Sequence, residues 1–286
     1  MLHFVCAMAY GDCLITLSQL EQAAASEDRW QLIGTGVTRR VSQLLRRPLP
    51  VAELLADKAA FYTIKERGPA AAVTDFLRVR AELKKRCAPG DRLAFERRDL
   101  RNSALIPPGC SGVFAPRSQS AYDDRRALVQ ALLGTTTDWA PVGAPVLPVR
   151  RVTINPCARY RRRWLSRELI DNVVRLTQER GWQLTLIDPC GQYAAWASQV
   201  QTYLPRPDLT VAAQALRDSD LYLGPDSFFI HLAHYYRVPH FGFYYPDHLY
   251  FLTPGMRELG NFLGFGQARE YPLLEHGVRS FLDRGA

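Results

Sequence analysis

The sequence lacks long apolar runs, clustered cysteines and an evident leader. Its longest apolar stretches, such as residues 228–236, are far shorter than the roughly 18–20 residues that a membrane-spanning helix needs. No basic segment precedes the first apolar residues, and Asp12 interrupts them, so we expect no secretory signal peptide. The six cysteines contain no CxxC pair, which predicts neither a disulfide framework nor a zinc site. Reduced thiols and a cytoplasmic location are the simplest interpretation.

The composition is that of a folded, basic protein. With 47% hydrophobic and 22% charged residues, the chain of 286 residues is not disordered as a whole. Its length predicts two domains, at roughly 150 residues each. The net charge of +8 is uneven, because residues 1–150 carry 21 Lys and Arg against 15 Asp and Glu. This basic first half suits an anionic partner, such as a phosphorylated glycan, an acidic membrane surface or a nucleic acid.

The first half shows a mixed pattern of short strands and helices. Residues 3–9 are an apolar strand candidate, Tyr10-Gly11-Asp12 breaks the run, and residues 13–25 have helical spacing. The remaining expected strands are 30–36, 93–95 and 112–115, and the remaining expected helices are 51–64, 70–86 and 122–134. The stretch 140–150 contains three prolines and one glycine, which is typical of a semi-rigid linker. We therefore expect domains at 1–145 and 146–286.

The second half alternates strands and helices regularly. The expected strands are 151–156, 182–188, 220–224 and 238–245, and the expected helices are 166–181, 209–219 and 226–237. This alternation predicts a parallel, doubly wound sheet. Ligands of such sheets bind outside the carboxyl ends of the strands, so the residues that follow each strand are the first candidates for a site.

Two of these strand ends carry suitable chemistry. Asp226 and Ser227 follow the strand 220–224 and begin a helix, whose unpaired N–H groups and dipole suit a diphosphate. The alternative is that Asp226 is only an N-cap, and that His231 on the helix is only packed. After the strand 151–156, four arginines surround Tyr160 and could neutralise phosphate charge. The alternative there is a solvated basic loop.

Asp12 follows the first strand of the chain, directly after Gly11. A carboxylate at that position, in a cleft between two domains, could act as a general base. The alternative is an ordinary Gly-Asp turn.

Two patterns that could bind a metal ion do not predict a metal site. Asp218-Ser219-Asp220 enters the sheet at the edge opposite to the ligand edge, and His231 and His234 have no third ligand nearby in sequence. We predict no metal and no cofactor.

Three segments together resemble the heptosyltransferase-like glycosyltransferases, glycosyltransferase family 9. YGDCLITLSQL (10–20) is similar to their first loop and helix, and NPCARYRRRW (155–164) to a segment ending in Lys-x-Trp, with Arg162 at the lysine position. ALRDSDLYLGPDSFFIHLAHYYRVPHFGFY (215–244) resembles their most specific signature. The matching positions there are Asp226, Ser227, His231, Leu232, Ala233, Pro239 and Gly242. Phe228 departs from it, because the family has glycine at that position.

The resemblance implies an α/β, GT-B-like fold. Two Rossmann-like, doubly wound domains would face a central cleft, with the N-terminal domain reduced and the last helix crossing back. The implied activity is inverting, metal-independent transfer of a sugar, heptose or a related one, from an ADP- or other nucleotide-diphosphate donor. The implied acceptor is an anionic glycan or glycolipid of the lipopolysaccharide type. The protein would be cytoplasmic, with peripheral contact at the inner membrane.

The resemblance also assigns roles to residues. Asp12 would be the catalytic base, with Gly11 binding substrate beside it, and Arg162 would stabilise the departing diphosphate. The other implied substrate-binding residues are Arg159, Arg163, Asp188, Asp226, Ser227, Phe228 and His231. Among them, Asp226 would bind sugar hydroxyls and Asp188 would lie near the nucleotide base.

Two other functions remain open from the sequence. Phe228 and the reduced N-terminal domain are compatible with a catalytically silent nucleotide-sugar-binding or scaffold protein. The charge of the first half is compatible with nucleic-acid binding, which the resemblance does not favour and which strong salt dependence would reveal.

Overall fold

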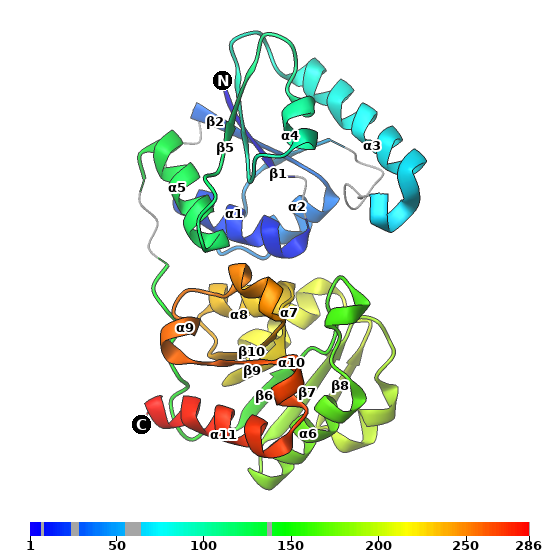
Figure 1. Cartoon of the computed structure of the whole chain (residues 1–286), viewed down its shortest axis with the longest axis vertical. Coiled ribbons are helices and arrows are strands. Elements are labelled where there is room, and N and C mark those ends of the chain that lie inside the picture. Colours follow the sequence, from blue (N-terminus) through cyan, green and yellow to red (C-terminus); the bar gives the residue numbers. More distant parts are fainter. Residues whose placement is uncertain (7–8, 24–28, 55–63, 136–138, 286) are drawn as a thin grey trace. The chain divides into compact units, whose positions relative to one another are not determined.

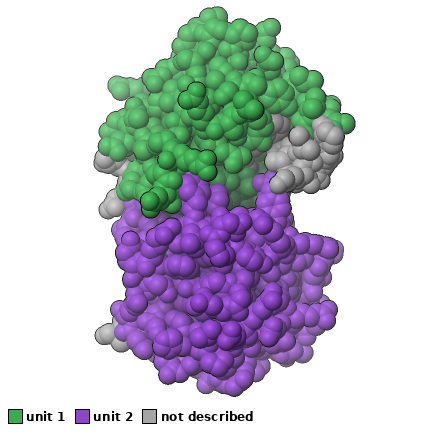
Figure 2. Space-filling view, in the orientation of Figure 1, with its two compact units in different colours: residues 1–138 green, residues 139–286 purple. Residues whose placement is uncertain are grey.

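The computed structural model describes residues 1–6, 9–23, 29–54, 64–135 and 139–285. The chain divides into two compact units, Met1–Asp138 and Trp139–Ala286 (Figures 1 and 2). The sequence predicted this division a few residues later, within the proline-rich stretch. No helix among the described residues is both long enough and apolar enough to cross a membrane.

The first unit is built on a parallel five-stranded sheet in the order β3-β2-β1-β4-β5. The strands are β1 (Leu2–Cys6), β2 (Trp30–Gly34), β3 (Val51–Glu53), β4 (Arg92–Phe95) and β5 (Ser111–Phe114). The helices are α1 (Tyr10–Gln22), α2 (Gly36–Ser42), α3 (Ile64–Arg86), α4 (Leu100–Leu105) and α5 (Ala121–Leu133). This strand order is that of a Rossmann-like domain.

Two local predictions for this unit are wrong. Val51–Glu53 is a strand rather than the start of a helix, because it pairs with β2 at the sheet edge. The rest of that expected helix, 55–63, lies outside the described residues. Gly11 and Asp12 do not form a loop. They belong to the first turn of α1, which begins at Tyr10 after an extended Ala9 whose carbonyl accepts a hydrogen bond from the Cys13 N–H.

The second unit contains a parallel six-stranded sheet in the order β11-β10-β9-β6-β7-β8. Its strands are β6 (Arg151–Ile154), β7 (Gln183–Asp188), β8 (Thr202–Pro205), β9 (Leu221–Pro225), β10 (His240–Tyr244) and β11 (Phe262–Gly264). The α-helices are α6 (Arg167–Glu179), α7 (Leu209–Arg217), α8 (Phe228–Tyr236), α9 (Met256–Leu259), α10 (Phe265–Ala268) and α11 (Tyr271–Leu282). The last long helix, α11, packs on α6 and β11 within this unit.

Sequence patterns located the inner elements of this unit but missed β8 and β11. Both are short edge strands without a clear apolar alternation. Read from its first strand, β6, the sheet has the Rossmann order, so the strand order reverses between β6 and β9. The predicted α/β fold class with two Rossmann-like units is confirmed.

Asp220 shows why the D-x-D triplet is structural. Its Oδ2 accepts hydrogen bonds from the backbone N–H groups of Arg150, at 2.9 Å, and Arg151, at 2.8 Å. The carboxylate thus anchors the beginning of β6 beside the beginning of β9, at the amino edge of the sheet. This supports the structural interpretation of the triplet over a metal-binding one.

One cysteine prediction is wrong. The structure joins Cys157 and Cys190 in a disulfide, whereas the sequence pattern predicted free thiols. The two residues are 33 positions apart, and no short motif relates them. They meet because each follows the carboxyl end of a strand, and these two strands, β6 and β7, are neighbours in the sheet.

His240, in β10, is a buried histidine of the second unit. Its Nδ1 lies 2.9 Å from the Val238 carbonyl oxygen and its Nε2 lies 2.7 Å from the Thr253 hydroxyl. A neutral ring with its proton on Nδ1 satisfies both contacts. Burial lowers the pKa of His240 from 6.5 to about 4, although the hydrogen bond to Val238 opposes this shift.

We expect His240 to make the protein less stable in acid. Between pH 6.5 and 4, the unfolded state binds a proton that the folded state excludes, so the free energy of unfolding falls as the pH falls. This difference in pKa between the unfolded and folded states corresponds to about 3 kcal/mol. Urea titrations at several pH values should show this loss in the wild type and a shallower slope in His240→Gln. His276→Gln, at an exposed position of α11, is the control. Equal slopes in wild type and His240→Gln contradict the assignment.

Candidate functional site

Asp226 lies at the carboxyl edge of the second sheet, between β9 and α8. It is 2% exposed, and its backbone N–H donates to the Phe243 carbonyl of the neighbouring strand. The N-cap of α8 is Ser227, so the interpretation of Asp226 as a simple cap is wrong. The position is next to the reversal in strand order between β6 and β9, where sheets of this type bind ligands.

The Asp226 carboxylate is surrounded by cationic or protonatable groups. Arg163 Nη1 donates to Oδ2 at 2.7 Å and to the Asp226 carbonyl at 3.2 Å. His248 Nδ1 lies 3.1 Å from Oδ2, and His231 Nε2 lies 4.0 Å from Oδ1. Burial alone raises the pKa of Asp226, but His248, His231 and Arg163 together outweigh it and lower that pKa below its ordinary value. The carboxylate is therefore ionised at neutral pH.

His248 connects this carboxylate to Arg162. The Arg162 Nη2 atom is 3.1 Å from His248 Nε2 and 3.6 Å from Asp247 Oδ2. The His248 ring therefore lies between the Asp226 carboxylate and the Arg162 guanidinium, 3.1 Å from each. The side chain of Arg162 is 62% exposed, so much of its guanidinium remains available to an anion. Sequence reasoning missed His248, although it follows the carboxyl end of an expected strand, β10.

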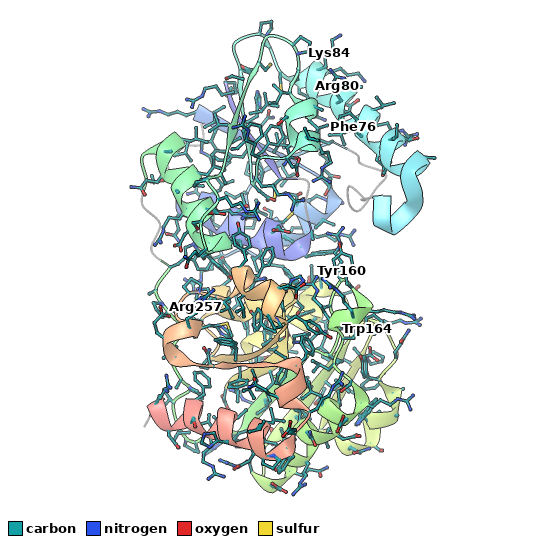
Figure 3. All side chains as sticks on the ribbon, viewed as in Figure 1. Phe76, Arg80, Lys84, Tyr160, Trp164 and Arg257 are labelled. Atoms are coloured by element: carbon teal, nitrogen blue, oxygen red, sulfur yellow. A yellow bond between two sulfur atoms is a disulfide. The ribbon has the colours of Figure 1, made fainter. Side chains whose placement is uncertain are left out.

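The arginine-rich loop also carries two aromatic residues, Tyr160 and Trp164 (Figure 3). The Arg163 and Arg159 guanidinium groups lie 5.2 and 5.6 Å from the Tyr160 ring centroid. The Trp164 indole N–H donates to the Ala158 carbonyl at 2.6 Å. Of the predicted arginines, Arg163 is the one that pairs with Asp226, while Arg159 is exposed on the same loop. The loop is thus more than a solvated basic segment.

The beginning of α8 offers backbone N–H groups beside this cluster. Ser227 is extended and its hydroxyl makes no capping hydrogen bond, although the oxygen is buried. Phe228 is the first residue of α8, and its ring contacts Phe229 edge-to-face at 5.4 Å. A Cβ at Gly224, in β9, would clash with the Tyr222 hydroxyl, so a larger residue there would displace the Tyr222 side chain. At the N-terminus of α8 this chain thus has the bulky Phe228, whereas the family that its sequence resembles has glycine at that position.

Asp188 is engaged inside the protein. It is 0% exposed, and its Oδ2 accepts hydrogen bonds from the Tyr193 N–H at 2.7 Å and the Tyr203 hydroxyl at 2.9 Å. The carboxylate thereby shapes the loop that follows β7. Contact with a nucleotide base remains a prediction for this position.

A second charged cluster lies at the carboxyl edge of the first sheet. Asp12 follows β1 within α1, and its Oδ1 accepts a hydrogen bond from Arg125 Nη2 of α5 at 3.1 Å. Arg125 is 3% exposed at its side chain, while Asp12 is 18% exposed. Arg125 therefore orients a carboxylate that solvent can still reach.

Glu96 is the third charged residue of this cluster. It follows β4 directly, is 3% exposed, and its Oε1 accepts from Cys6 Sγ and Thr16 Oγ1, each at 3.0 Å. Burial raises the pKa of Glu96, the positive charge of Arg125 opposes this shift, and Asp12 adds to it. Sequence reasoning missed both Glu96 and Arg125. No local pattern distinguishes the buried Arg125 from Arg126, the next residue of α5, whose side chain is 43% exposed.

We expect Asp226→Asn to destabilise the protein by about 3 kcal/mol at pH 7, because it leaves the Arg163 cation without its buried partner. The loss should shrink as the pH falls below about 4, because the unfolded aspartate then binds a proton while the folded carboxylate, whose pKa is lowered, stays ionised. Asp247→Asn, 61% exposed in the same cluster, is the control and should cost less than about 1 kcal/mol. Urea unfolding followed by tryptophan fluorescence is suitable, since four of the five tryptophans lie in the second unit. Equal losses in the two variants contradict the pairing.

Comparison with known proteins supports the fold assignment. No protein-family model and no curated protein sequence matches the chain. Among solved structures, E. coli heptosyltransferase WaaC with ADP-2-deoxy-2-fluoro heptose is similar, with a TM-score of 0.67, 15% identity, and coverage of 100% of this chain and 99% of that one.

Two further solved structures agree with this. A glycosyl transferase family 9 protein from Veillonella parvula has a TM-score of 0.63 and 13% identity, over 99% of this chain and 95% of that one. E. coli ADP-heptose lps heptosyltransferase II has a TM-score of 0.62 and 12% identity, over 98% of each chain. The resemblance predicted from the sequence is thus confirmed at the level of the fold, which is the GT-B-like fold of the heptosyltransferases.

Proposed function

We propose that the protein is an inverting, metal-independent glycosyltransferase that uses a nucleotide-diphosphate-sugar donor. The observation that carries this proposal is the Asp226 cluster. A buried carboxylate, two arginines and two histidines gather at the strand ends of a Rossmann-like unit, within the fold of heptosyltransferases. The fold supports sugar transfer as the type of reaction, and the cluster supports an anionic donor.

The second unit supplies the donor side. The N–H groups at the beginning of α8 suit a diphosphate, and the exposed guanidinium of Arg162 can neutralise charge on it as the glycosidic bond breaks. Arg159 can add a further positive charge from the same loop. Asp226 accepts hydrogen bonds from hydroxyl groups of the sugar through Oδ1, while Arg163 donates to Oδ2. Since arginines supply the positive charge, no metal ion is required for the leaving group.

An adenosine diphosphate sugar is the donor best supported. The similar E. coli WaaC structures contain ADP or ADP-2-deoxy-2-fluoro heptose. We propose ADP-heptose or a related sugar nucleotide for this chain on that basis.

The first unit supplies the base. Arg125 orients Asp12 through Oδ1, and Asp12 takes the proton of the acceptor hydroxyl as its oxygen attacks the anomeric carbon. The bond from that carbon to the diphosphate breaks in the same displacement, so the configuration inverts. Gly11 lies beside Asp12 in the same helical turn and is the proposed substrate contact next to the base.

The acceptor that we propose is an anionic glycan or glycolipid of the lipopolysaccharide type. The basic first half of the chain supports it, since residues 1–150 carry a charge excess of +6. Action at the inner face of the cytoplasmic membrane belongs to the same proposal.

We expect Asp12→Asn to lower the transfer rate by about 10²–10⁴-fold, the usual effect of losing a general base. The assay measures ADP released from ADP-heptose in the presence of heptose-deficient lipopolysaccharide. ADP affinity, measured by calorimetry, should stay unchanged, because Asp12 belongs to the acceptor side. Asp123→Asn, whose side chain is 51% exposed on α5, is the matched control and should keep full activity.

Unchanged transfer by Asp12→Asn contradicts the base assignment. If the wild type binds ADP-heptose but neither transfers nor hydrolyses it, the silent sugar-nucleotide-binding alternative is favoured. Phe228→Gly then separates the two cases, since activity gained by restoring the family's glycine identifies Phe228 as the cause of silence.

A further inference from the structure

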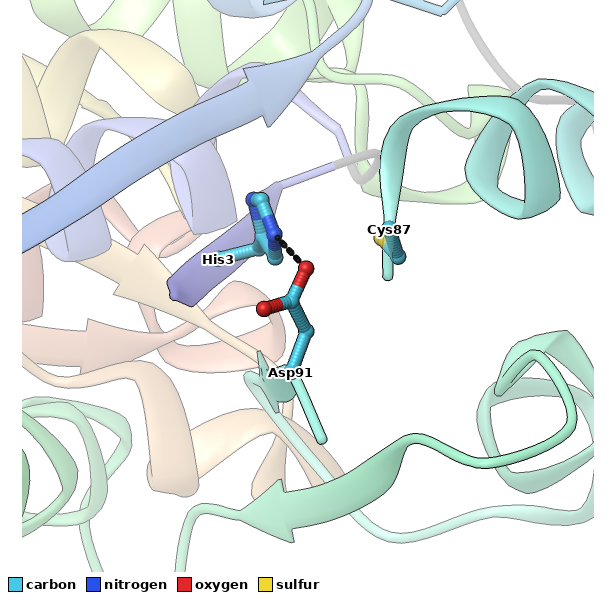
Figure 4. Close-up of side chains that lie close together, drawn as sticks. All are labelled: His3, Cys87 and Asp91. Atoms are coloured by element: carbon cyan, nitrogen blue, oxygen red, sulfur yellow. Dashed lines mark hydrogen bonds and ion pairs between the residues drawn. The ribbon is translucent and has the colours of Figure 1, made fainter. Parts of the chain in front are cut away.

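The opposite edge of the first sheet carries a separate group of metal-ligating side chains. His3 lies near the beginning of β1, Asp91 immediately precedes β4, and Cys87 follows the end of α3 (Figure 4). Cys110 immediately precedes β5. These are the amino ends of parallel strands, whereas Asp12 and Glu96 follow the carboxyl ends. The group therefore lies away from the proposed transfer chemistry.

Three of these residues already converge. One ligand atom each from His3, Cys87 and Asp91 lies within 4.8 Å of the other two, and His3 Nε2 is 3.0 Å from Asp91 Oδ2. His3 is 2% exposed and Asp91 is 8% exposed. In a tetrahedral site with metal–ligand bonds of about 2.0–2.3 Å, the ligand atoms lie less than about 4 Å apart. The three side chains therefore need to move only slightly closer together to bind one metal ion.

Cys110 is not among these three converging ligands, and it is the candidate for a fourth one. Its Sγ donates to the Ala88 carbonyl at 3.3 Å, one residue beyond Cys87. The surrounding backbone is firmly held, because Gly90 N–H donates to the Gly109 carbonyl and Ser111 N–H to the Asp91 carbonyl. Two segments that each carry one thiol are thus fixed side by side. Both Cys87 and Cys110 are free of disulfides.

The donor set fits zinc. One imidazole nitrogen, two thiolates and one carboxylate oxygen are ligand types that Zn²⁺ takes in four-coordinate structural sites. The ligands bring three negative charges when both thiols are ionised, against two positive charges on the metal. The amino group of Met1, 2.6 Å from Asp91 Oδ1, offsets the excess. That contact is of the kind that orients a ligating carboxylate.

We propose that His3, Cys87, Asp91 and Cys110 bind one zinc ion at the amino edge of the first sheet. The ion ties β1, the end of α3 and the turns before β4 and β5 into one unit. Its role is structural. The ion takes no part in the proposed sugar transfer, which is itself metal-independent. The ligands come from four places in the chain, which is why no CxxC-type spacing announces them.

The test measures metal in the full-length protein, purified in a non-thiol reductant. After removal of metal with a chelator, titration with Zn²⁺ alone should show one tight site per chain. Cobalt in place of zinc should give thiolate-to-metal charge-transfer absorption. We expect Cys87→Ser and Cys110→Ser each to weaken zinc binding by at least about tenfold. Cys13→Ala, at a buried cysteine of the same unit that forms no disulfide and lies outside the group, should bind zinc as the wild type does.

Cys190→Ser provides the second control, for zinc bound in the second unit. Reduction of the Cys157–Cys190 disulfide would make these two thiols and Asp188 another group of potential ligands. The proposal is overturned if no zinc binds above background. It is also overturned if Cys190→Ser loses the metal while Cys87→Ser keeps it. Since the readouts are metal content and absorption, failure of the proposed transferase activity leaves this test unaffected.

Discussion

The second unit depends on one buried ion pair, between Asp226 and Arg163. An ionised carboxylate that is 2% exposed requires a partner, because leaving it unpaired in the interior costs several kcal/mol. The pair joins the loop after β6 to Asp226, the residue that follows β9, across the point where the strand order reverses. Once Arg163 is held there, Arg162 is directed to His248 and remains largely exposed. The ion pair thus arranges the charges that a diphosphate would meet.

The first unit repeats this arrangement with different residues. Asp12 follows β1 and Glu96 follows β4, and Arg125 of α5 acts on both carboxylates. The two strands are neighbours, and the strand order again reverses between them. Burial differs between the two carboxylates, so Glu96 is largely removed from water while Asp12 stays partly accessible. Asp12, a partly accessible carboxylate held by a buried cation, is suited to proton transfer. The buried Glu96 is suited to holding the cluster in place.

The amino edges of both sheets carry structural contacts instead of a candidate transfer site. In the second unit, Asp220 binds the backbone at the beginning of β6. In the first unit, Asp91 binds the Met1 amino group, His3 and the Ala88 N–H. These carboxylates hold strands together. Because parallel strands present all their amino ends at one edge and all their carboxyl ends at the other, each sheet separates its structural anchors from its candidate site.

The sequence by itself determined the alternation of strands and helices in the second half, and hence the parallel sheet and the positions of Asp226 and Ser227 directly after a strand. These features depend on periodicity within short segments, which local sequence records. Only the tertiary structure decided that Arg163 pairs with Asp226, that His248 and Arg125 join the clusters, and that Cys157 meets Cys190. Those contacts join residues 22 to 113 positions apart, and strand order, which no local pattern encodes, brings them together.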